Sequence, residues 1–346
     1  MDKVKSIEIT PNTTVLELVK KMYNTGFQGR KLSESVELFA RMLLDESVTI
    51  LLGYSASLSV AGQWKIIKWL IENNYIDILV STGANISEDI IEAMGNSYYK
   101  GSHLCNDQEL FLSGFNRYYD VIGKESDYLQ MTEYIAEFIL TLDENNNYSS
   151  REFLYLFGKY LNSNNINSIL SCAFQKDIPV FCPAICDSPF GDASLIAKSK
   201  KFHLKIDSIK DYTEFMGIAS FVTDSGVFYI GGGVPKDFIQ LFAVTPDLLF
   251  HDRKIPNRLF PKKRTGTDET YYPHKYAIQI TTDSPQWGGL SGCSFEEAIS
   301  WGKESDRTNF IQCYCDATIA LPIIMQAICE HQIKRNSKNI NSKFKE

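Results

Sequence analysis

The sequence has few of the features that mark nucleic-acid-binding or membrane-spanning proteins. Of its 346 residues, 35 are Lys or Arg and 42 are Asp or Glu, so the formal net charge is −7. Nucleic acids bind positively charged surfaces, and this balance therefore argues against them as the main partner. No segment approaches the roughly 20 apolar residues that a membrane helix requires, and residues 1–22 lack the apolar core of a signal peptide. We expect a cytoplasmic protein.

Metal-binding patterns are also missing. The eight cysteines are spread along the chain, and neither the pair Cys182 and Cys186 nor the pair Cys313 and Cys315 has a partner pair at the spacing of a zinc site. The five histidines show no clustering. We therefore expect no metal, and we expect reduced, buried thiols, which are usual in the cytoplasm.

Alternation of strands and helices is the main structural pattern. Two apolar segments with strand character are each followed by a small, polar, glycine-containing loop and a helix. Such alternation builds a parallel sheet, whose ligands bind where strand ends turn into loops. Ser87 precedes acidic residues at the start of the second helix and is its expected N-cap. The predicted strands are residues 48–54 and 76–86, and the predicted helices are 63–74 and 87–95.

The rest of the chain continues this pattern. Residues 108–170 are predicted to be mostly helical, with a polar break at 141–150. The polar stretch 250–275 is expected to be an exposed excursion, and the tail 334–346 is expected to be frayed. Pro235 fits the first turn of a helix. Further strands, each leading into a loop or a helix, are predicted within residues 177–192, 226–240, 276–284 and 310–325.

Neither an internal repeat nor a shift in composition marks a domain boundary. With 44% hydrophobic residues, the chain can bury a large core. We therefore predict the α/β class, as a single large domain over residues 1–346 with a core at about 45–330 and a central, mostly parallel sheet flanked by helices.

Two groups of residues at strand ends are candidate ligand contacts. The glycines at 231–233 follow an apolar strand and precede a helix, where a nucleotide phosphate could meet backbone amides, although they do not form the GxGxxG fingerprint. A tight structural turn is the alternative. Glu88, Asp187 and Asp192 lie at strand-to-helix junctions, where they could bind ammonium groups or ribose hydroxyls, or could cap helices.

A lysine follows a helix that has clear signals at both ends. Ser294 can cap this helix, Glu297 can complete a capping box, and Gly302 can supply the left-handed residue at its end. Lys303 comes next, close to Trp301. A free lysine with a pKa of ~10.4 is a poor nucleophile, but burial beside an indole would favour the neutral amine, which can form a Schiff base. A lysine that extends into solvent is the alternative interpretation.

Several motifs, taken in order, resemble the deoxyhypusine synthase family. They span about residues 45–330 in the family's order, and SWGK is specific to the family. The resemblance is greater to the bacterial deoxyhypusine synthase-like or homospermidine synthase-like branch than to the eukaryotic enzyme. The matching motifs are LLGYSASLSVAG, STGANISEDII, PVFCPAICDSPFGD, GGGVPKDF, GGLSGCSFEEAISWGK and YCDATIALPII.

The resemblance implies an NAD-dependent aminobutyl transferase with a Rossmann-like fold. Family members oxidise spermidine, release diaminopropane and hold the remaining carbon unit as an imine on a lysine. They then pass this unit to an acceptor amine, which is a protein lysine in deoxyhypusine synthase and putrescine in homospermidine synthases. By this resemblance Lys303 is the imine-forming lysine. The family also implies a homotetramer with active sites shared across a dimer interface.

The same resemblance assigns the other site residues. Carboxylates would hold the ends of a cationic polyamine, an apolar wall would line its middle, and a closed site would protect the imine from water. NAD is expected to contact Ala56, Ser57, Leu58, Thr82, Gly83, Asp187, Thr282, Asp316 and Ala317. The polyamine is expected to contact Glu88, Asp192, Gly232, Glu297 and Trp301.

Two positions depart from the family's pattern. Asp237 stands where the family usually has a histidine beside the polyamine, and Leu290 stands where it has a polyamine-binding aspartate. Asp237 is expected to act in catalysis, as a base or as an anchor for an ammonium group. Because the acidic contacts are rearranged, we hypothesise transfer from spermidine to a free diamine, with a homospermidine-type product. The alternatives are a deoxyhypusine synthase that modifies a lysine of a translation factor, and a non-catalytic NAD-binding paralogue.

Overall fold

A computed structural model describes residues 2–305 and 309–345 of the chain. The chain divides into two units, each built from several segments. The first unit consists of Met1–Ala56, Asn73–Val80 and Thr213–Ile340, and the second of Ser57–Glu72, Ser81–Tyr212 and Asn341–Glu346. The chain passes between the two units several times. The single domain predicted over residues 1–346 stays a prediction.

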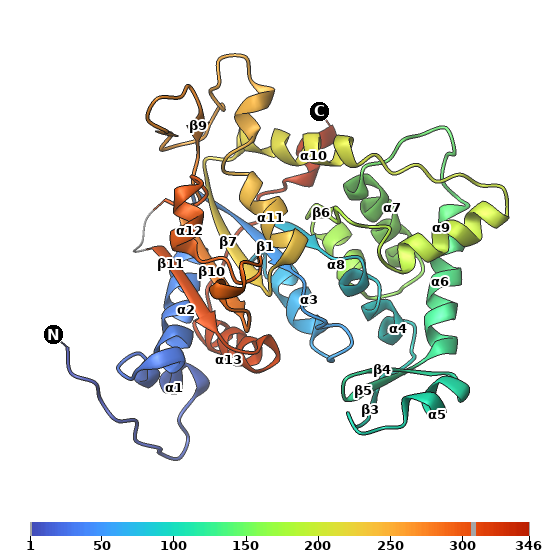
Figure 1. Ribbon diagram of the computed structural model, residues 1–346, viewed down its shortest axis with the longest axis horizontal. Coiled ribbons are helices and arrows are strands. Elements are labelled where there is room, and N and C mark those ends of the chain that lie inside the picture. The colour runs from blue at the N-terminus through green and yellow to red at the C-terminus, as the bar shows by residue number, and fades with distance from the viewer. Residues whose placement is uncertain (1, 306–308, 346) are drawn as a thin grey trace. The chain divides into compact units, whose positions relative to one another are not determined.

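The core of the first unit is a sheet of parallel strands (Figure 1). Its strands are β1 (Val48–Tyr54), β2 (Ile78–Ser81), β7 (Asp224–Ile230), β10 (Tyr276–Thr281) and β11 (Phe310–Tyr314). They follow the order β11-β10-β7-β1-β2, and parallel pairing joins β1 to β7, β7 to β10 and β10 to β11. Every residue of β1, β2 and β7 is buried, as expected for a sheet covered on both faces. The predicted strand at 48–54 is confirmed.

Helices α2 (Phe27–Leu44), α11 (Gly233–Leu241) and α13 (Ala317–Glu330) of the first unit pack on this sheet, and α1 (Val15–Met22) packs on α2 and α13. The unit also contains α12 (Phe295–Ser300). α2 packs against β10 and β11, and α11 packs against β1. The predicted place of Pro235, in the first turn of a helix, is confirmed in α11. The smaller elements are η2 (Ile218–Phe221), η3 (Pro246–Leu249), β8 (Lys262–Lys263), β9 (Thr270–Tyr271) and η4 (Pro285–Trp287).

The second unit is mainly helical. Its helices are α3 (Trp64–Glu72), α4 (Asp89–Ala93), α5 (Asp107–Leu112), α6 (Glu125–Ile139), α7 (Ser150–Ser163), α8 (Ile169–Gln175) and α9 (Pro189–Ser199), and its short 3-10 helices are η1 (Ala84–Ile86) and η6 (Asn341–Lys345). α10 (Ser208–Gly217) carries the chain from this unit into the first. The polar break predicted at 141–150 is confirmed, because it separates α6 from α7.

A small antiparallel sheet interrupts the helices of the second unit. Its strands are β3 (Tyr99–Lys100), β4 (Phe115–Tyr118) and β5 (Val121–Lys124), in the order β3-β5-β4, and a further short strand of this unit is β6 (Val180–Phe181). The mostly helical prediction for 108–170 is wrong at β4 and β5. Tyr119 has φ +56°, a left-handed value that ends regular structure and allows the tight turn between these strands.

The predicted N-cap at Ser87 is wrong. The helix α4 begins one residue later, after Glu88. Ser87 Oγ instead donates hydrogen bonds to Gly83 O at 2.9 Å and to Ala84 O at 3.2 Å. The 3-10 turn η1 comes immediately before Ser87, and the hydroxyl therefore closes that turn and does not open the next helix.

The predicted exposed excursion at 250–275 is anchored in the interior of the first unit. Arg258 is 8% exposed, and its guanidinium carbon lies 4.9 Å from the ring centroid of Phe242 and 5.6 Å from that of Tyr272. His274 is 1% exposed. The prediction is wrong for these residues, because aromatic rings bury an arginine that the sequence pattern assigns to solvent.

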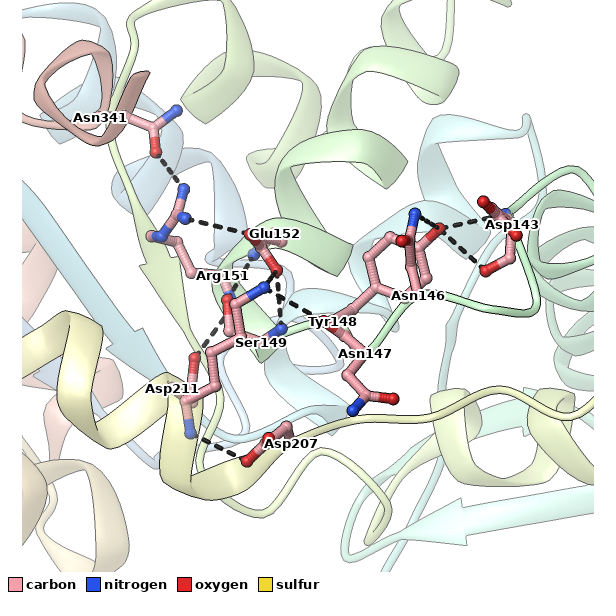
Figure 2. Close-up of polar contacts among 11 residues, drawn as sticks. Asp143, Asn146, Asn147, Tyr148, Ser149, Arg151, Glu152, Asp207, Asp211 and Asn341 are labelled. Atoms are coloured by element: carbon pink, nitrogen blue, oxygen red, sulfur yellow. Dashed lines mark hydrogen bonds and ion pairs between the residues drawn. The ribbon is translucent and has the colours of Figure 1, made fainter. Parts of the chain in front are cut away.

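The tail was predicted to be frayed over 334–346, of which residue 346 lies outside the described residues. Its described part is held in both units. In the first unit Arg335 forms a bidentate ion pair with Asp77, with N–O distances of 2.9 and 2.6 Å, and the two side chains are 5% and 2% exposed. In the second unit Asn341 Oδ1 accepts a hydrogen bond from Arg151 Nη1 at 2.9 Å (Figure 2). The prediction is wrong because these polar side chains make specific buried contacts with residues far away in the sequence.

Candidate active site

Lys303 follows α12 after Trp301 and Gly302, and the local sequence sets both ends of that helix. Ser294 Oγ accepts a hydrogen bond from Glu297 N at 3.1 Å, so the predicted cap at Ser294 is confirmed. Gly302 has φ +80°, and a Cβ there would lie 2.9 Å from the ring of Tyr271. The predicted left-handed glycine is therefore confirmed, and the packing leaves no room for a side chain. Lys303 is held in place by this turn.

The amine of Lys303 is largely buried and contacts two side chains of α11. Nζ lies 3.2 Å from Asp237 Oδ1 and 3.4 Å from Gln240 Oε1, and the lysine side chain is 12% exposed. The ring centroid of Trp301 is 5.7 Å from Nζ. The Asp237 side chain and Trp301 are themselves 44% and 59% exposed, so the open side of the amine lies at these two residues. The structure thus brings together three predicted site residues.

Two ionisable groups in the interior near Lys303 are not among the predicted site residues. Lys236 on α11 is 0% exposed, and Glu304 is 2% exposed. Burial lowers the pKa of Lys236 to about 8 and raises that of Glu304 well above its usual range. Glu304 Oε1 has no hydrogen-bond partner within the described part of the chain. The signal available in the sequence was the four-residue spacing of Lys236 and Gln240, which places both on one face of a helix.

The glycines between β7 and α11 form a tight turn whose amides are bonded within the protein. Gly231 and Gly233 have φ values of +72° and +61°. Gly232 N donates to Ser55 Oγ at 3.0 Å. Gly233 N donates to Ser291 Oγ, also at 3.0 Å. The left-handed φ values and these bonds confirm the tight turn, and the phosphate interpretation stays a prediction.

The other predicted residues of the first unit gather after its parallel strands. The carboxyl ends of such strands meet at one edge of the sheet, where ligands bind. Asp316 Oδ1 accepts a hydrogen bond from Thr318 N at 2.7 Å and caps α13. Glu297 is exposed on α12. Ala56 follows β1, Thr282 follows β10, and Asp316 and Ala317 follow β11.

In the second unit, the predicted NAD contacts lie on loops before helices. Ser57 is exposed, whereas Leu58 is 0% exposed and belongs to the core. Thr82 Oγ1 accepts a hydrogen bond from the side chain of Asn85 at 3.0 Å. A Cβ at Gly83 would lie 2.2 Å from the hydroxyl of Ser188, so this loop packs tightly on the start of α9.

Asp187 and Asp192 flank the start of α9, where helix capping was the alternative interpretation. The N-cap is Ser188, whose hydroxyl accepts a hydrogen bond from Phe190 N. Both aspartates are exposed, and Asp192 Oδ2 accepts a hydrogen bond from Tyr128 Oη at 3.2 Å. Their carboxylates are therefore not used as caps and can accept hydrogen bonds from hydroxyl or ammonium groups.

Glu88 is buried near two tyrosines of the same unit. It is 7% exposed, and burial raises the pKa of its carboxyl to about 7. Tyr98 Oη donates to the Glu88 carbonyl at 3.2 Å, and the rings of Tyr98 and Tyr118 meet edge to face with centroids 6.1 Å apart. Burial and the charge of Glu88 raise the pKa of Tyr118 to about 12. A cation beside this carboxyl would favour its ionised form.

In each unit, the predicted NAD contacts include side chains of the kind that bind part of a dinucleotide. Ribose hydroxyls need acceptors, and exposed aspartates are present at Asp316 in the first unit and at Asp187 in the second. Ser57 and Thr282 are exposed and add hydroxyl groups. Among the described residues, no group of three or more His, Cys, Asp or Glu is placed to hold a metal ion, and no helix is long and apolar enough to cross a membrane.

Comparisons with known proteins agree on one family. The family model described as deoxyhypusine synthase matches residues 17–328. "Probable deoxyhypusine synthase 2" of Methanosarcina mazei is 43% identical over 319 residues, which cover 92% of this chain and 87% of the relative. A "deoxyhypusine synthase-like protein" of Chlorobaculum tepidum is 34% identical over 328 residues, covering 93% and 88%.

The fold is also similar to a solved structure. The crystal structure of a "putative deoxyhypusine synthase" from Entamoeba histolytica has a TM-score of 0.64 to this chain, at 18% sequence identity. The match covers 97% of this chain and 99% of the other. At this identity the likeness supports the α/β fold with its central sheet and carries no detail of the site.

Proposed function

Because this chain belongs to the deoxyhypusine synthase family, a family of transferases, we propose that it is an NAD-dependent transferase that moves an aminoalkyl group from a polyamine such as spermidine to an acceptor amine. The observation that carries the proposal is the environment of Lys303. Its amine is largely buried, lies 3.2 Å from the Asp237 carboxylate and is close to an exposed indole.

Lys303 would be the group that carries the aminoalkyl unit. Its ammonium must first lose a proton, and Asp237 Oδ1 at 3.2 Å can accept it. The neutral amine then forms a C=N bond with the oxidised carbon of the polyamine, and diaminopropane leaves as the free amine. Trp301 would shield this bond from water at the open side of the lysine. The acceptor amine finally replaces Lys303 on the same carbon.

NAD, when bound, would supply a hydride acceptor for the polyamine carbon next to nitrogen and would return the hydride to the final imine. In the first unit Ala56, Thr282, Asp316 and Ala317 are proposed to hold it, and in the second unit Ser57, Leu58, Thr82, Gly83 and Asp187. The polyamine contacts are proposed at Gly232, Glu297 and Trp301 in the first unit and at Glu88 and Asp192 in the second.

We propose a free diamine as the acceptor, which gives a homospermidine-type product. The support is the change in charge around the lysine: Asp237 adds a carboxylate that contacts Lys303, and Leu290 removes one that the family usually has. A second candidate acceptor is a protein lysine, which the name of the 43% identical archaeal relative favours. The homotetramer that the family implies stays a prediction.

A product assay tests the proposal. Purified protein is incubated with NAD and spermidine, with and without putrescine, then treated with borohydride, which reduces an imine to a stable amine. Mass spectrometry should find diaminopropane, homospermidine and a four-carbon adduct on Lys303. Lys303→Ala should lose all three and still bind NAD, whereas Lys200→Ala, which removes an exposed lysine of the second unit, should keep them.

The outcomes separate the two acceptors. Diaminopropane and the adduct without homospermidine would favour a protein lysine as acceptor. Release of diaminopropane by the Lys303→Ala variant at the normal rate would contradict the imine mechanism. No diaminopropane and no adduct from the unaltered protein would contradict transfer from spermidine altogether.

A further inference from the structure

A short hairpin of the first unit lies beside the segment that carries Lys303. Its strands β8 and β9 pair antiparallel, and β9 is labelled in Figure 1. Gly266, in the turn between them, has φ +78°, a left-handed value that suits glycine. Residues 262–271 are called the basic hairpin below, because residues 262–264 are all Lys or Arg.

Two side chains of the basic hairpin bind carbonyl groups on either side of Lys303. Arg264 Nη2 donates to Ser300 O at 3.3 Å. Lys262 Nζ donates to Ser305 O at 2.7 Å. The two residues are two positions apart, and successive side chains of a strand point to opposite faces, so both can reach the same neighbouring segment.

The chain that leaves the basic hairpin makes further contacts with the same segment. The ring of Tyr271 lies against Gly302, where a Cβ would be 2.9 Å from it. His274 N donates to Lys303 O at 2.9 Å, and Ser305 N donates to His274 O at 3.2 Å. One stretch of chain, residues 262–274, therefore holds the backbone before, at and after the lysine.

The helix α12 is too short to hold Lys303 in place by itself. It has 6 residues, and isolated helices of fewer than about 12 residues are unstable in water. Ser300 is its last residue, so the Ser300 carbonyl lies among those that have no partner within a helix. The amine of Lys303 must nevertheless stay close to Asp237 Oδ1, 3.2 Å away, to pass on its proton. Contacts from outside the helix therefore decide where the lysine lies.

We propose that Lys262 and Arg264 are positioning residues for Lys303. By binding the carbonyl groups before and after it, they fix the backbone on both sides of the lysine and so keep its amine in place. The inference rests on the proposed function, because the position of this amine affects catalysis only if Lys303 forms the imine. A displacement of about 1 Å in a reacting group can cost up to roughly a hundredfold in rate.

The test compares three double or single variants of the intact protein. Lys262→Met combined with Arg264→Met removes both donors and keeps apolar side chains. Lys262→Arg combined with Arg264→Lys keeps a cationic donor at each position and should rescue the effect. Lys263→Met is the matched control, since Lys263 is exposed on the same strand and forms no hydrogen bond or ion pair with any described residue.

Hydrogen–deuterium exchange of the ligand-free protein reports the position of the backbone without any polyamine chemistry. The amides of Lys303 and Ser305, which donate to Ala298 O and His274 O, should exchange roughly two- to tenfold faster in the double methionine variant, as expected for the loss of one or two hydrogen bonds. The rescue variant and Lys263→Met should exchange like the unaltered protein.

The rate of diaminopropane release from spermidine with NAD is the second measurement. The double methionine variant should lose on the order of tenfold in kcat and keep its KM within about twofold, because the amine is misplaced and the polyamine contacts are intact. A role through charge alone would give a different pattern. Exposed cations repel a cationic polyamine, so removal of Lys262 and Arg264, or of Lys263, would then lower the KM.

Three results would overturn the inference: unchanged exchange at residues 303 and 305 in the double methionine variant, unchanged kcat in that variant, or an equal loss of kcat in Lys263→Met. Faster exchange in the double methionine variant of a protein that, unaltered, releases no diaminopropane would support the contacts of the basic hairpin and contradict the proposed function. The failure of the inference and that of the proposed function are therefore distinguishable.

Discussion

Replacing Glu88 with glutamine should stabilise the folded protein at pH 8 and change its stability little at pH 5. Glu88 is 7% exposed, and no described residue donates a hydrogen bond to its carboxyl group to offset the loss of water. Burial first, and then the charge of Asp89, raises its pKa from 4.5 to about 7. A glutamine side chain has the same shape and carries no charge at any pH. The substitution therefore removes the titration and keeps the packing.

The sign and the magnitude follow from proton binding. Between pH 4.5 and 7 the folded state keeps a proton that the unfolded chain has lost, so the stability that Glu88 contributes is full below pH 4.5 and is lost as the pH rises through 7. A difference of about 2.5 pKa units corresponds to roughly 3 kcal/mol above pH 7 and to less than about 1 kcal/mol at pH 5. Glu88→Gln should regain this amount.

Urea unfolding followed by circular dichroism at both pH values measures the effect. Glu109→Gln, a substitution of an exposed glutamate in α5, is the matched control and should show no pH-dependent change. A gain that is equal at pH 5 and pH 8, or a loss of stability at pH 8, would refute the reasoning. An equal gain would mean that folding does not change the titration of Glu88, and a loss would mean that its neighbours stabilise the charged carboxyl.

Asp89→Asn separates stability from function at the same place in the chain. Asp89 is 0% exposed, burial raises its pKa to about 7, and its carboxylate accepts a hydrogen bond from Ile169 N at 2.7 Å, which an amide oxygen can also do. This variant should therefore also show a gain at pH 8, at least as large as that of Glu88→Gln. Only Glu88→Gln should raise the KM for the polyamine, because only Glu88 is proposed to contact it.

Two further predictions concern packing. Arg335→Met should destabilise the protein by about 3–5 kcal/mol, because it leaves the Asp77 carboxylate buried with its ion pair broken. Urea unfolding measures this loss, and Lys334→Met, a substitution of an exposed lysine, is the control. A loss below about 1 kcal/mol would contradict the buried ion pair. Gly83→Ala should destabilise by about 1–3 kcal/mol, since its Cβ would lie 2.2 Å from Ser188 Oγ. Gly217→Ala, where nothing lies within 4 Å, should not, and equal effects would contradict the close packing at Gly83.

The strands of the first unit could be predicted because they are buried on both faces. β1 is an uninterrupted run of buried residues, and the predicted strand has the same ends. The turn at Gly302 and the cap at Ser294 were also predictable, since both depend on the residues next to them. These elements depend on the chemistry of neighbouring residues, which can be identified directly in the sequence.

Contacts between residues far apart in the sequence could not be predicted in this way. Arg335 and Asp77 are separated by 258 positions, and nothing near Arg335 distinguishes it from the other polar residues of the tail. β4 and β5 are half-exposed strands of four residues each, too short and too polar to give a strand pattern. Lys236 resembles a surface lysine until the carbonyl groups of Leu290 and Cys293 are placed around it.

Three ionisable groups occupy positions that an ordinary core would fill with apolar side chains: Glu88 in the second unit, and Lys236 and Glu304 in the first. Burial disfavours the charged form of each, so each lowers stability at some pH relative to an uncharged residue of similar shape. When a protein is engineered for stability alone, substitutions that remove such buried ionisable groups are therefore readily found. The proposed chemistry needs one of these groups, the Glu88 carboxyl, which ionises when a cation lies beside it. The stability gained and the polyamine affinity lost in Glu88→Gln should therefore have a single cause, the removal of a carboxyl group whose ionised form the folded interior disfavours.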